Sequence, residues 1–405
     1  MQGQKPGKHL VIALGLASLL SIVCSVPGGC QELVPPTQQA TANRIFDQSL
    51  QGNRLKCTID RENPSLDFTF HFDAGFRISC PVLQFGGQRT RVWVLARVTP
   101  EGGTPVLLGM VTIFRHSAIE PSLLARTGTR VFFHVSGGFS VGEGRYRVEV
   151  ALSDSQNRIC RRAWRIKIPH RWQNAVPAVL AANQVAPLSI PPWHGPQHKD
   201  GLRLAILLSA ASHNPRAPRL GAGYQMMLLQ ILSTLLQQVP CKSVRLVAFN
   251  LDQERVIYRA DSFESTGFDD LQRAFNGLNL GVVSVQTLQK RDEWANMLTT
   301  LANQQLTAQP PPDAVIILGR SFRYVRKLPR EMMMFHYEGM PGFFYFENGP
   351  DNLFPDSLSF LIKSLKGKTY RVSTPHDLGA AIEKMLAHVR GAGPSGETNL
   401  SSRGR

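Results

Sequence analysis

The stretch GLRLAILLSAASHNPRAPRLGAG, residues 201–223, decides how the second half of the chain folds. Residues 202–208 are almost wholly apolar, which is typical of a strand buried on both faces of a sheet. A loop follows, and apolar residues at helical spacing then continue over residues 224–239, until Pro240 ends the pattern. This order predicts the beginning of a doubly wound α/β domain. Ligands of such sheets bind beyond the carboxyl ends of the strands, so function is expected around the loop of residues 209–220.

Length, composition and the first residues indicate an exported protein of two domains. The chain has 405 residues, 43% of them hydrophobic, and a net charge of +16, which bears on partners rather than on fold. In residues 1–29, Lys5 and Lys8 precede an apolar run, which is typical of a signal peptide. The alternatives are a membrane anchor and a lipid on Cys24 or Cys30. No other apolar run is long enough to span a bilayer. We therefore expect a secreted or periplasmic protein, or one attached to the cell envelope.

A β-domain is predicted after a polar spacer at residues 30–52. In residues 53–168, apolar and polar side chains alternate in short runs separated by turn signals; Tyr146 and Val148, for example, alternate with Arg145 and Arg147. Such runs are typical of an antiparallel β-sandwich, and the size of the region favours an immunoglobulin-like arrangement.

Six cysteines are too few for a disulfide scaffold. Cys57 lies in the first predicted strand and Cys160 in the last, and such strands often lie near each other in a sandwich. We therefore expect one disulfide between them, in preference to a bond between Cys57 and Cys80. Cys241 is expected to be unpaired.

Composition divides the rest of the chain into a linker, a second domain and a tail. Residues 169–200 are rich in proline and predict a linker, which Trp172 and Trp193 would help to pack down. Residues 391–405 are small and polar and predict a disordered tail. Between them, the periodicity predicts strands at residues 202–208, 244–250, 256–258, 314–318, 343–346 and 369–372, and helices at 224–239, 268–275, 293–306, 358–365 and 375–389.

The order of these elements over residues 201–390 resembles the von Willebrand factor A-like domain superfamily. The ending is the most specific part: GKTYRV at residues 367–372, followed by a helix capped by Thr374, is similar to the closing segment of many secreted bacterial members. The predicted fold class is thus an all-β, immunoglobulin-like sandwich followed by an α/β doubly wound von Willebrand A-like domain. The resemblance implies partner binding at the carboxyl edge of the sheet, where many members hold a divalent metal on Asp-x-Ser-x-Ser and a later aspartate.

The chain departs from that metal site. Ser209, Ala211 and His213 stand at the Asp-x-Ser-x-Ser positions, and Arg320 lies about where the later aspartate belongs. Two carboxylates are replaced and a guanidinium is gained, so we expect no metal at this site and no cofactor.

Basic residues surround the same predicted edge. They are Arg216 and Arg219 in the first loop, and Arg320, Arg323, Arg326 and Arg330 after the strand at residues 314–318. Guanidinium groups bind carboxylate, sulfate and phosphate, which predicts an anion- or partner-binding edge. The alternative is a solvated loop in a protein that is basic everywhere. Nucleic acid is not expected as the partner of an exported protein.

Catalytic motifs are weak. Ser140 lies in a Gly-x-Ser-x-Gly match, but between two alternating strands rather than at a strand-to-helix turn. Gly221 and Gly223 lack the third glycine of a dinucleotide fingerprint, and neither His-Glu-x-x-His nor a close Cys-x-x-Cys pair occurs. The sequence therefore predicts a non-catalytic binding protein for a protein or an acidic polymer of the cell envelope. The alternatives are a structural envelope or adhesion component, and an enzyme with an unrecognised site.

Overall fold

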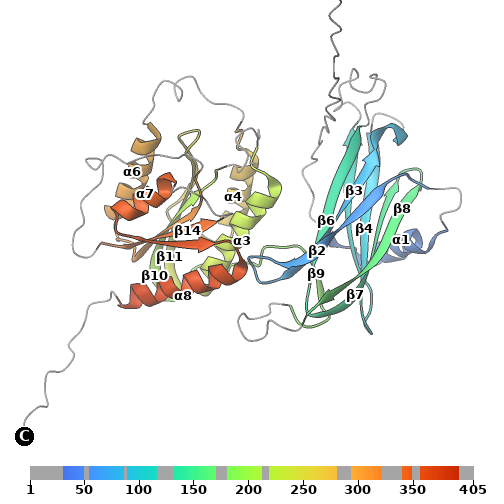
Figure 1. The fold of residues 1–405 in the computed structure, drawn as a ribbon, viewed down its shortest axis with the longest axis horizontal. Coiled ribbons are helices and arrows are strands. Elements are labelled where there is room, and N and C mark those ends of the chain that lie inside the picture. The colour runs from blue at the N-terminus through green and yellow to red at the C-terminus, as the bar shows by residue number, and fades with distance from the viewer. Residues whose placement is uncertain are drawn as a thin grey trace, which may run out of the picture.

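Three β-sheets organise the chain. The computed structural model describes residues 31–49, 54–85, 89–115, 131–169, 180–211, 219–280, 293–321, 340–348 and 356–391. The described strands form one sheet of five, one of six and one of four strands. Figure 1 shows the five- and four-stranded sheets together in one unit, and the six-stranded sheet with its helices in another.

The first unit is an antiparallel sandwich. Its strands are β1 (Glu32–Leu33), β2 (Thr58–Leu66), β3 (Phe72–Pro81), β4 (Arg89–Pro100), β5 (Val106–Arg115), β6 (Phe132–Val141), β7 (Gly144–Asp154), β8 (Ile159–Ile168) and β9 (Val185–Pro187), with a 3₁₀ turn at Val82–Gln84. The sheet orders are β1-β5-β4-β7-β8 and β2-β3-β6-β9. Alternation sends every second side chain into the core between the sheets, so that Tyr146, Val148 and Val150 are buried there.

Two segments that the sequence analysis placed outside the β-domain belong to the sandwich. Helix α1 (Pro36–Asp47) lies within the predicted spacer, and β9 lies within the predicted linker. Pro36 suits the first turn of a helix, because the missing N–H there needs no partner. Phe46 and Ala42 of α1 pack with Leu95 and Ala151 on the outer face of the five-stranded sheet.

The second unit is a six-stranded sheet with helices on both faces. Its elements are β10 (Leu202–Ser209), α3 (Ala222–Gln238), β11 (Cys241–Asn250), β12 (Arg255–Ala260), α4 (Gly267–Asn276), α6 (Glu293–Leu306), β13 (Ala314–Gly319), β14 (Gly342–Asn348), α7 (Ser357–Ser364), β15 (Lys368–Val372) and α8 (Pro375–Gly391). The strand order is β12-β11-β10-β13-β14-β15. Leu204 and Ile206 of β10 pack with α3 and α8, whereas Ala205 and Leu207 pack with α6 and α7. Burial on both faces explains the continuous apolar run of β10.

The predicted fold class is wrong. The prediction was an immunoglobulin-like sandwich followed by a doubly wound von Willebrand A-like domain. In the described part of the chain three sheets predominate and helix makes up 28% of the residues, and nothing gives positive support for a von Willebrand A-like domain. The six-stranded sheet is mixed, because β12 runs antiparallel to β11. The reason for the error is physical. Periodicity reports the burial of one element at a time, whereas strand order and direction depend on pairing between distant segments.

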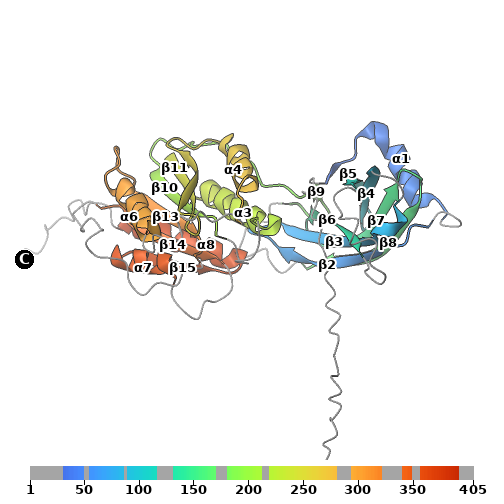
Figure 2. The same ribbon diagram turned by 90° about the horizontal axis from the view of Figure 1, so that it is seen from above.

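The two units touch through the hairpin of β2 and β3 and through the segment that follows β9. Figures 1 and 2 show the hairpin reaching from the sandwich to the neighbourhood of α3 and α8. Trp193 is buried and stacks on Phe263 with ring centroids 5.8 Å apart, and the hydroxyl of Ser233 on α3 donates to the carbonyl of Pro191 at 2.8 Å. The described helices include none that is long and apolar enough to cross a membrane.

Candidate functional site

The residues predicted at the carboxyl edge of the six-stranded sheet are only partly described. Ser209 is buried at the end of β10, and its hydroxyl donates to the carbonyl of Arg320 at 2.8 Å. Ala211 is buried as well, and Arg320 is 2% exposed, so neither side chain belongs to the described surface. Arg219 is exposed and forms an isolated β-bridge with Asn279. The remaining predicted residues lie outside the described part of the chain: His213, Arg216, Arg323, Arg326 and Arg330.

Beneath this edge, one buried carboxylate joins three elements. Asp356, which is fully buried, caps α7 by accepting from the backbone N–H and the hydroxyl of Ser359, both at 2.8 Å. Its second oxygen accepts from the hydroxyl of Tyr345 on β14 at 2.8 Å and from the N–H of Ser321 after β13 at 2.9 Å. Burial, reinforced by the charge of Asp356, raises the pKa of Tyr345 well above its ordinary value. These contacts join the segment after β13, the middle of β14 and the start of α7, and they use both oxygens of Asp356.

Basic side chains stand opposite each other on the outer face of the five-stranded sheet. Arg145 on β7 stands directly opposite Lys167 on β8, and Arg147 stands opposite Arg165. All four side chains are exposed; those of Arg145 and Arg147 keep 63% and 62% of their area accessible. We call these four residues, with Arg161 further along β8, the basic face. Like charges directly opposite each other destabilise a sheet, so this arrangement opposes folding.

Nearby acids neutralise little of the basic face. Glu149 is shared, because it accepts from Arg97 at 2.8 Å and from Arg147 at 3.1 Å. Burial tends to raise the pKa of Glu149, but the hydrogen bond and charge of Arg97, with those of Arg147, hold it below its ordinary value. Glu101 lies 3.7 Å from Arg145. The described residues provide no ion pair for Arg165 or Lys167, which leaves β8 as the more strongly charged strand.

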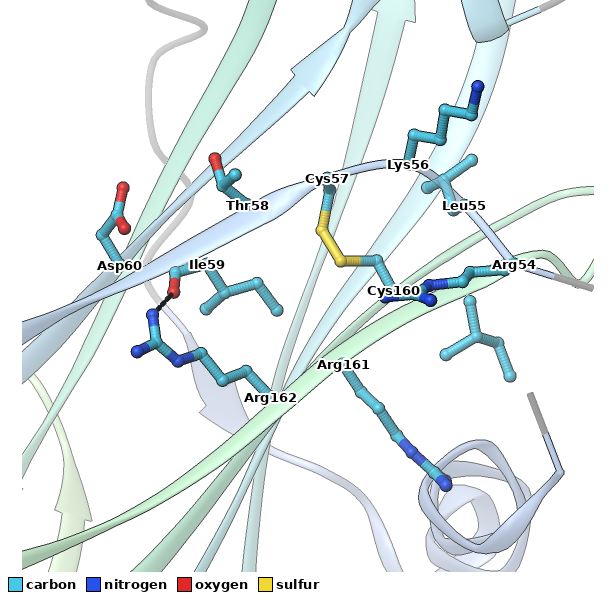
Figure 3. A pocket seen from close by; sticks show the side chains of 11 residues that line it. Arg54, Leu55, Lys56, Cys57, Thr58, Ile59, Asp60, Cys160, Arg161 and Arg162 are labelled. Atoms are coloured by element: carbon cyan, nitrogen blue, oxygen red, sulfur yellow. Dashed lines mark hydrogen bonds between the residues drawn. A yellow bond between two sulfur atoms is a disulfide. The ribbon is translucent and has the colours of Figure 1, made fainter.

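A pocket adjoins the basic face at the disulfide. It has a volume of about 560 Å³, and the Cys57–Cys160 bond forms part of its wall. Four basic residues and one acidic residue line it: Arg54, Lys56, Arg161, Arg162 and Asp60. Figure 3 shows the guanidinium of Arg162 reaching the carbonyl of Ile59. Arg161 donates to the carbonyls of Phe46 and Gln48, the latter at 3.0 Å. These contacts position the two guanidinium groups, whose planar, multiple N–H donors suit carboxylate, sulfate and phosphate.

The disulfide is the pair favoured from the sequence. Cys57 and Cys160 are bonded, with Cα atoms 6.1 Å apart, and the bond closes the open side of the sandwich between the two sheets. Cys80 and Cys241 are free and buried. Burial raises the pKa of the Cys80 thiol to about 12 and also raises that of Cys241, so neither thiol is activated for chemistry.

Sequence reasoning missed the basic face because its signal is divided between two strands. Arg145 and Arg147 are visible as the polar side of one alternating run, and Arg165 and Lys167 lie in another. Only the register of β7 against β8 puts them opposite each other. The described residues contain no group of three or more His, Cys, Asp or Glu arranged to hold a metal ion.

Comparisons with known proteins do not show a family for this chain. No protein-family model and no curated protein matches the chain. Among solved structures, Northeast Structural Genomics Consortium target SoR45 is 8% identical with a TM-score of 0.17, over 30% of this chain and 91% of that one. A β-glucuronidase of Bacteroides uniformis is 9% identical with a TM-score of 0.19, over 76% of this chain and 38% of that one. A glycosyl hydrolase family 2 member of Bacteroides cellulosilyticus is 9% identical with a TM-score of 0.19, over 75% of this chain and 37% of that one.

TM-scores this low do not establish a shared fold or a shared activity. None of these neighbours indicates a von Willebrand A domain. The chain spans about two fifths of the length of the glucuronidase that it matches.

Relief of the repulsion on the basic face should be measurable. The variant Arg165→Thr removes one of two opposed positive charges and introduces a residue that favours strands, so the free energy of unfolding of the sandwich should rise by about 0.2–1 kcal/mol. Urea titration at low ionic strength measures it, and the gain should shrink in salt. The matched control is Arg77→Thr, because Arg77 stands opposite Asp60 in the β2–β3 register and should give no gain. Equal or lower stability of Arg165→Thr would contradict the interpretation.

Proposed function

We propose that the protein is a non-catalytic binding protein whose basic face holds an acidic partner. The observation that supports this most is the direct opposition of Arg145 with Lys167 and of Arg147 with Arg165 on an exposed surface. Such pairs cost stability when the surface is empty. An acidic partner that lies between them converts the repulsion into attraction, which gives the arrangement a use.

The dimensions favour a chain of anionic groups over a single small anion. Arg161 and Lys167 are six positions apart along β8, which is about 20 Å at the usual rise of a strand. The pocket beside the disulfide extends the positive surface beyond Arg161. The partner is therefore an acidic polymer or an acidic protein segment. Export to a secreted or periplasmic location, proposed from the first residues, agrees with a disulfide, since oxidising compartments preserve such bonds.

Charge reversal on β8 tests the proposal. Full-length protein with Arg165→Glu and Lys167→Glu is compared with a control double variant, Lys363→Glu and Lys384→Glu, which changes net charge equally at exposed positions of α7 and α8. The probes are poly-glutamate, a sulfated polysaccharide and vesicles containing anionic lipid. We expect the first variant to bind at least about tenfold more weakly and the control to bind nearly as the wild type does, with the difference shrinking in salt.

Two outcomes would count against the proposal. Equal weakening by both variants would show that binding depends on net charge alone and not on the basic face. Unchanged binding by the β8 variant would place the acidic partner elsewhere.

A further inference from the structure

Strand β8 is the longest regular strand at the edge of a described sheet. The edge strands are β1 and β8 in one sheet, β12 and β15 in the second, and β2 and β9 in the third. Strand β8 has ten residues, contains no proline and pairs with β7 in an unbroken register. Strand β2 has nine residues, but Pro64 and a register shift between Glu62 and Ser65 interrupt it. The other four edge strands have six residues or fewer.

The register of β7 against β8 determines which backbone groups of β8 face outward. In an antiparallel pair, residues that bond to the partner strand alternate with residues whose N–H and C=O point away from it. The carbonyl of Ile159 points outward, because it accepts from the N–H of Leu55 at 3.0 Å. At the other end of the pair, the carbonyl of Arg145 points away from β8, because it accepts from the N–H of Glu101 at 2.8 Å. The outward positions in the second half of β8 are therefore Ala163, Arg165 and Lys167.

The outward edge of β8 is covered at its start. Figure 3 shows residues 54–60 beside this part of the strand. Ile159 forms an isolated β-bridge with this segment, and the guanidinium of Arg162 donates to one of its carbonyls. Within the described part of the chain, no residue hydrogen-bonds to the outward N–H and C=O groups of residues 163–168. This half of β8 therefore has donors and acceptors for one further strand.

The side chains of residues 163–168 determine what a further strand must carry. Arg165 and Lys167 are exposed on the outer face and belong to the basic face. Trp164 and Ile166 lie on the inner face, where Ile166 is buried and Trp164, half-buried, packs against the core of the sandwich. Neighbouring strands bring side chains of the same face together. An added strand therefore fits best when carboxylates on its outer face alternate with apolar side chains on its inner face.

We propose that residues 163–168 of β8 bind an extended acidic segment of a partner protein as an added strand, an inference that rests on the function proposed above. Backbone hydrogen bonds hold the segment, and its carboxylates lie beside Arg165 and Lys167. The same two cations disfavour a second copy of β8 as the occupant, because like charges opposite each other destabilise a strand pair. A polysaccharide or a lipid surface can meet the cations, but neither offers a strand of alternating N–H and C=O groups to the edge.

Methylated peptides test strand addition on the full-length protein. The parent probe is a capped, fluorescent peptide of sequence Thr-Glu-Val-Glu-Val-Glu-Thr, and its affinity is measured by anisotropy at low ionic strength. One derivative carries N-methyl groups on both valines, and the other carries them on two of the glutamates, so that charge is the same in all. Only alternate N–H groups of an added strand face β8. One derivative should therefore bind at least about tenfold more weakly than the parent, and the other nearly as the parent does.

The variant Ala163→Pro tests the same contact from the side of the protein. It removes one outward N–H of β8 but changes no charge and no hydrogen bond to β7, and proline is tolerated where the N–H of an edge strand faces solvent. It should weaken binding of the parent peptide and leave binding of a sulfated polysaccharide unchanged. The double variant Arg165→Glu with Lys167→Glu should weaken both. If Ala163→Pro does not fold, as judged by circular dichroism, the methylated peptides decide alone.

The outcomes separate this inference from the function on which it rests. Loss of affinity in one methylated derivative alone supports strand addition. Equal affinities of the two derivatives, or no binding of the parent peptide, overturn strand addition. The proposed function survives that result if charge reversal on β8 still weakens binding of the sulfated polysaccharide. If charge reversal weakens binding of no probe, both the inference and the proposed function are wrong.

Discussion

Replacing Asp356 by alanine is expected to lower the free energy of unfolding of the six-stranded unit by about 3–7 kcal/mol. The side chain is fully buried and accepts from Tyr345, Ser321 and Ser359. Alanine would leave the Tyr345 hydroxyl and the Ser321 N–H buried without this acceptor, and would also remove the N-cap of α7. Each orphaned donor costs about 1–3 kcal/mol and the cap about 1 kcal/mol.

Urea titration measures this effect through the fluorescence of Trp193 and Trp294, which are both buried in the cores of this unit. The matched control is Tyr345→Phe, which removes one donor from Asp356 and leaves the other three in place. Its expected cost is about 0.5–1.5 kcal/mol. If Asp356→Ala is no more destabilised than Tyr345→Phe, Asp356 is not the centre of the network.

Loss of the Cys57–Cys160 disulfide should have the second largest effect. The bonded residues are 103 positions apart in the sequence, and closing a loop of that length removes about 4–5 kcal/mol of chain entropy from the unfolded state. The double variant Cys57→Ser with Cys160→Ser should therefore lose about 2–5 kcal/mol, all of it from the sandwich. Guanidinium titration followed by circular dichroism of the strands measures the loss.

Reduction of the wild-type protein with dithiothreitol is the control for this variant. Wild-type protein in dithiothreitol should approach the stability of the double variant, and the double variant itself should not respond to dithiothreitol. Cys80 and Cys241 should remain unreactive towards thiol reagents until the protein unfolds, because both are buried. A wild-type protein that keeps its stability under full reduction would contradict the expected role of the bond.

Local elements of the six-stranded unit could be predicted from the sequence, because burial pattern is a local property. The helix predicted at residues 293–306 coincides with α6, and the strand predicted at residues 244–250 lies within β11. In the sequence, Thr374 and Asp377 predict the start of the last helix. In the structure the N–H of Thr374 donates to the carboxylate of Asp377, and the N–H of Asp377 donates to the hydroxyl of Thr374.

The fold class and the site could not be predicted in the same way. Helix α1 buries only Ala42 and Phe46, and the Pro35-Pro36 pair at its start is typical of a spacer, so the sequence here does not predict a helix. Strand β9 has three residues and no periodicity of its own. Strand pairing decides which basic side chains stand opposite each other, and the register of β7 against β8 cannot be derived from the sequence of either strand.

Asp67 shows the same limit at the scale of a single side chain. In the sequence it is an ordinary polar position of an alternating run. Its hydrogen bond with Gln230 of α3 joins residues 163 positions apart, and the turn that places it has a positive φ at Phe70. Neither condition can be recognised within a short window of sequence.

The late position of β9 in the sequence delays completion of the sandwich during synthesis. It comes after all the other strands of the sandwich and pairs with β6 through Val185, Ala186 and Pro187, opposite Val141, Ser140 and Phe139. The nascent sandwich therefore stays one strand short until residue 187 has left the ribosome. Phe68 packs against the core that contains α3 and α8, and Phe70 lies beside Gly379 of α8, so both rings also lack their covering surface until these helices follow. A polypeptide that terminates after Ile168 would keep an open edge and two uncovered aromatic rings, which are the features that promote self-association.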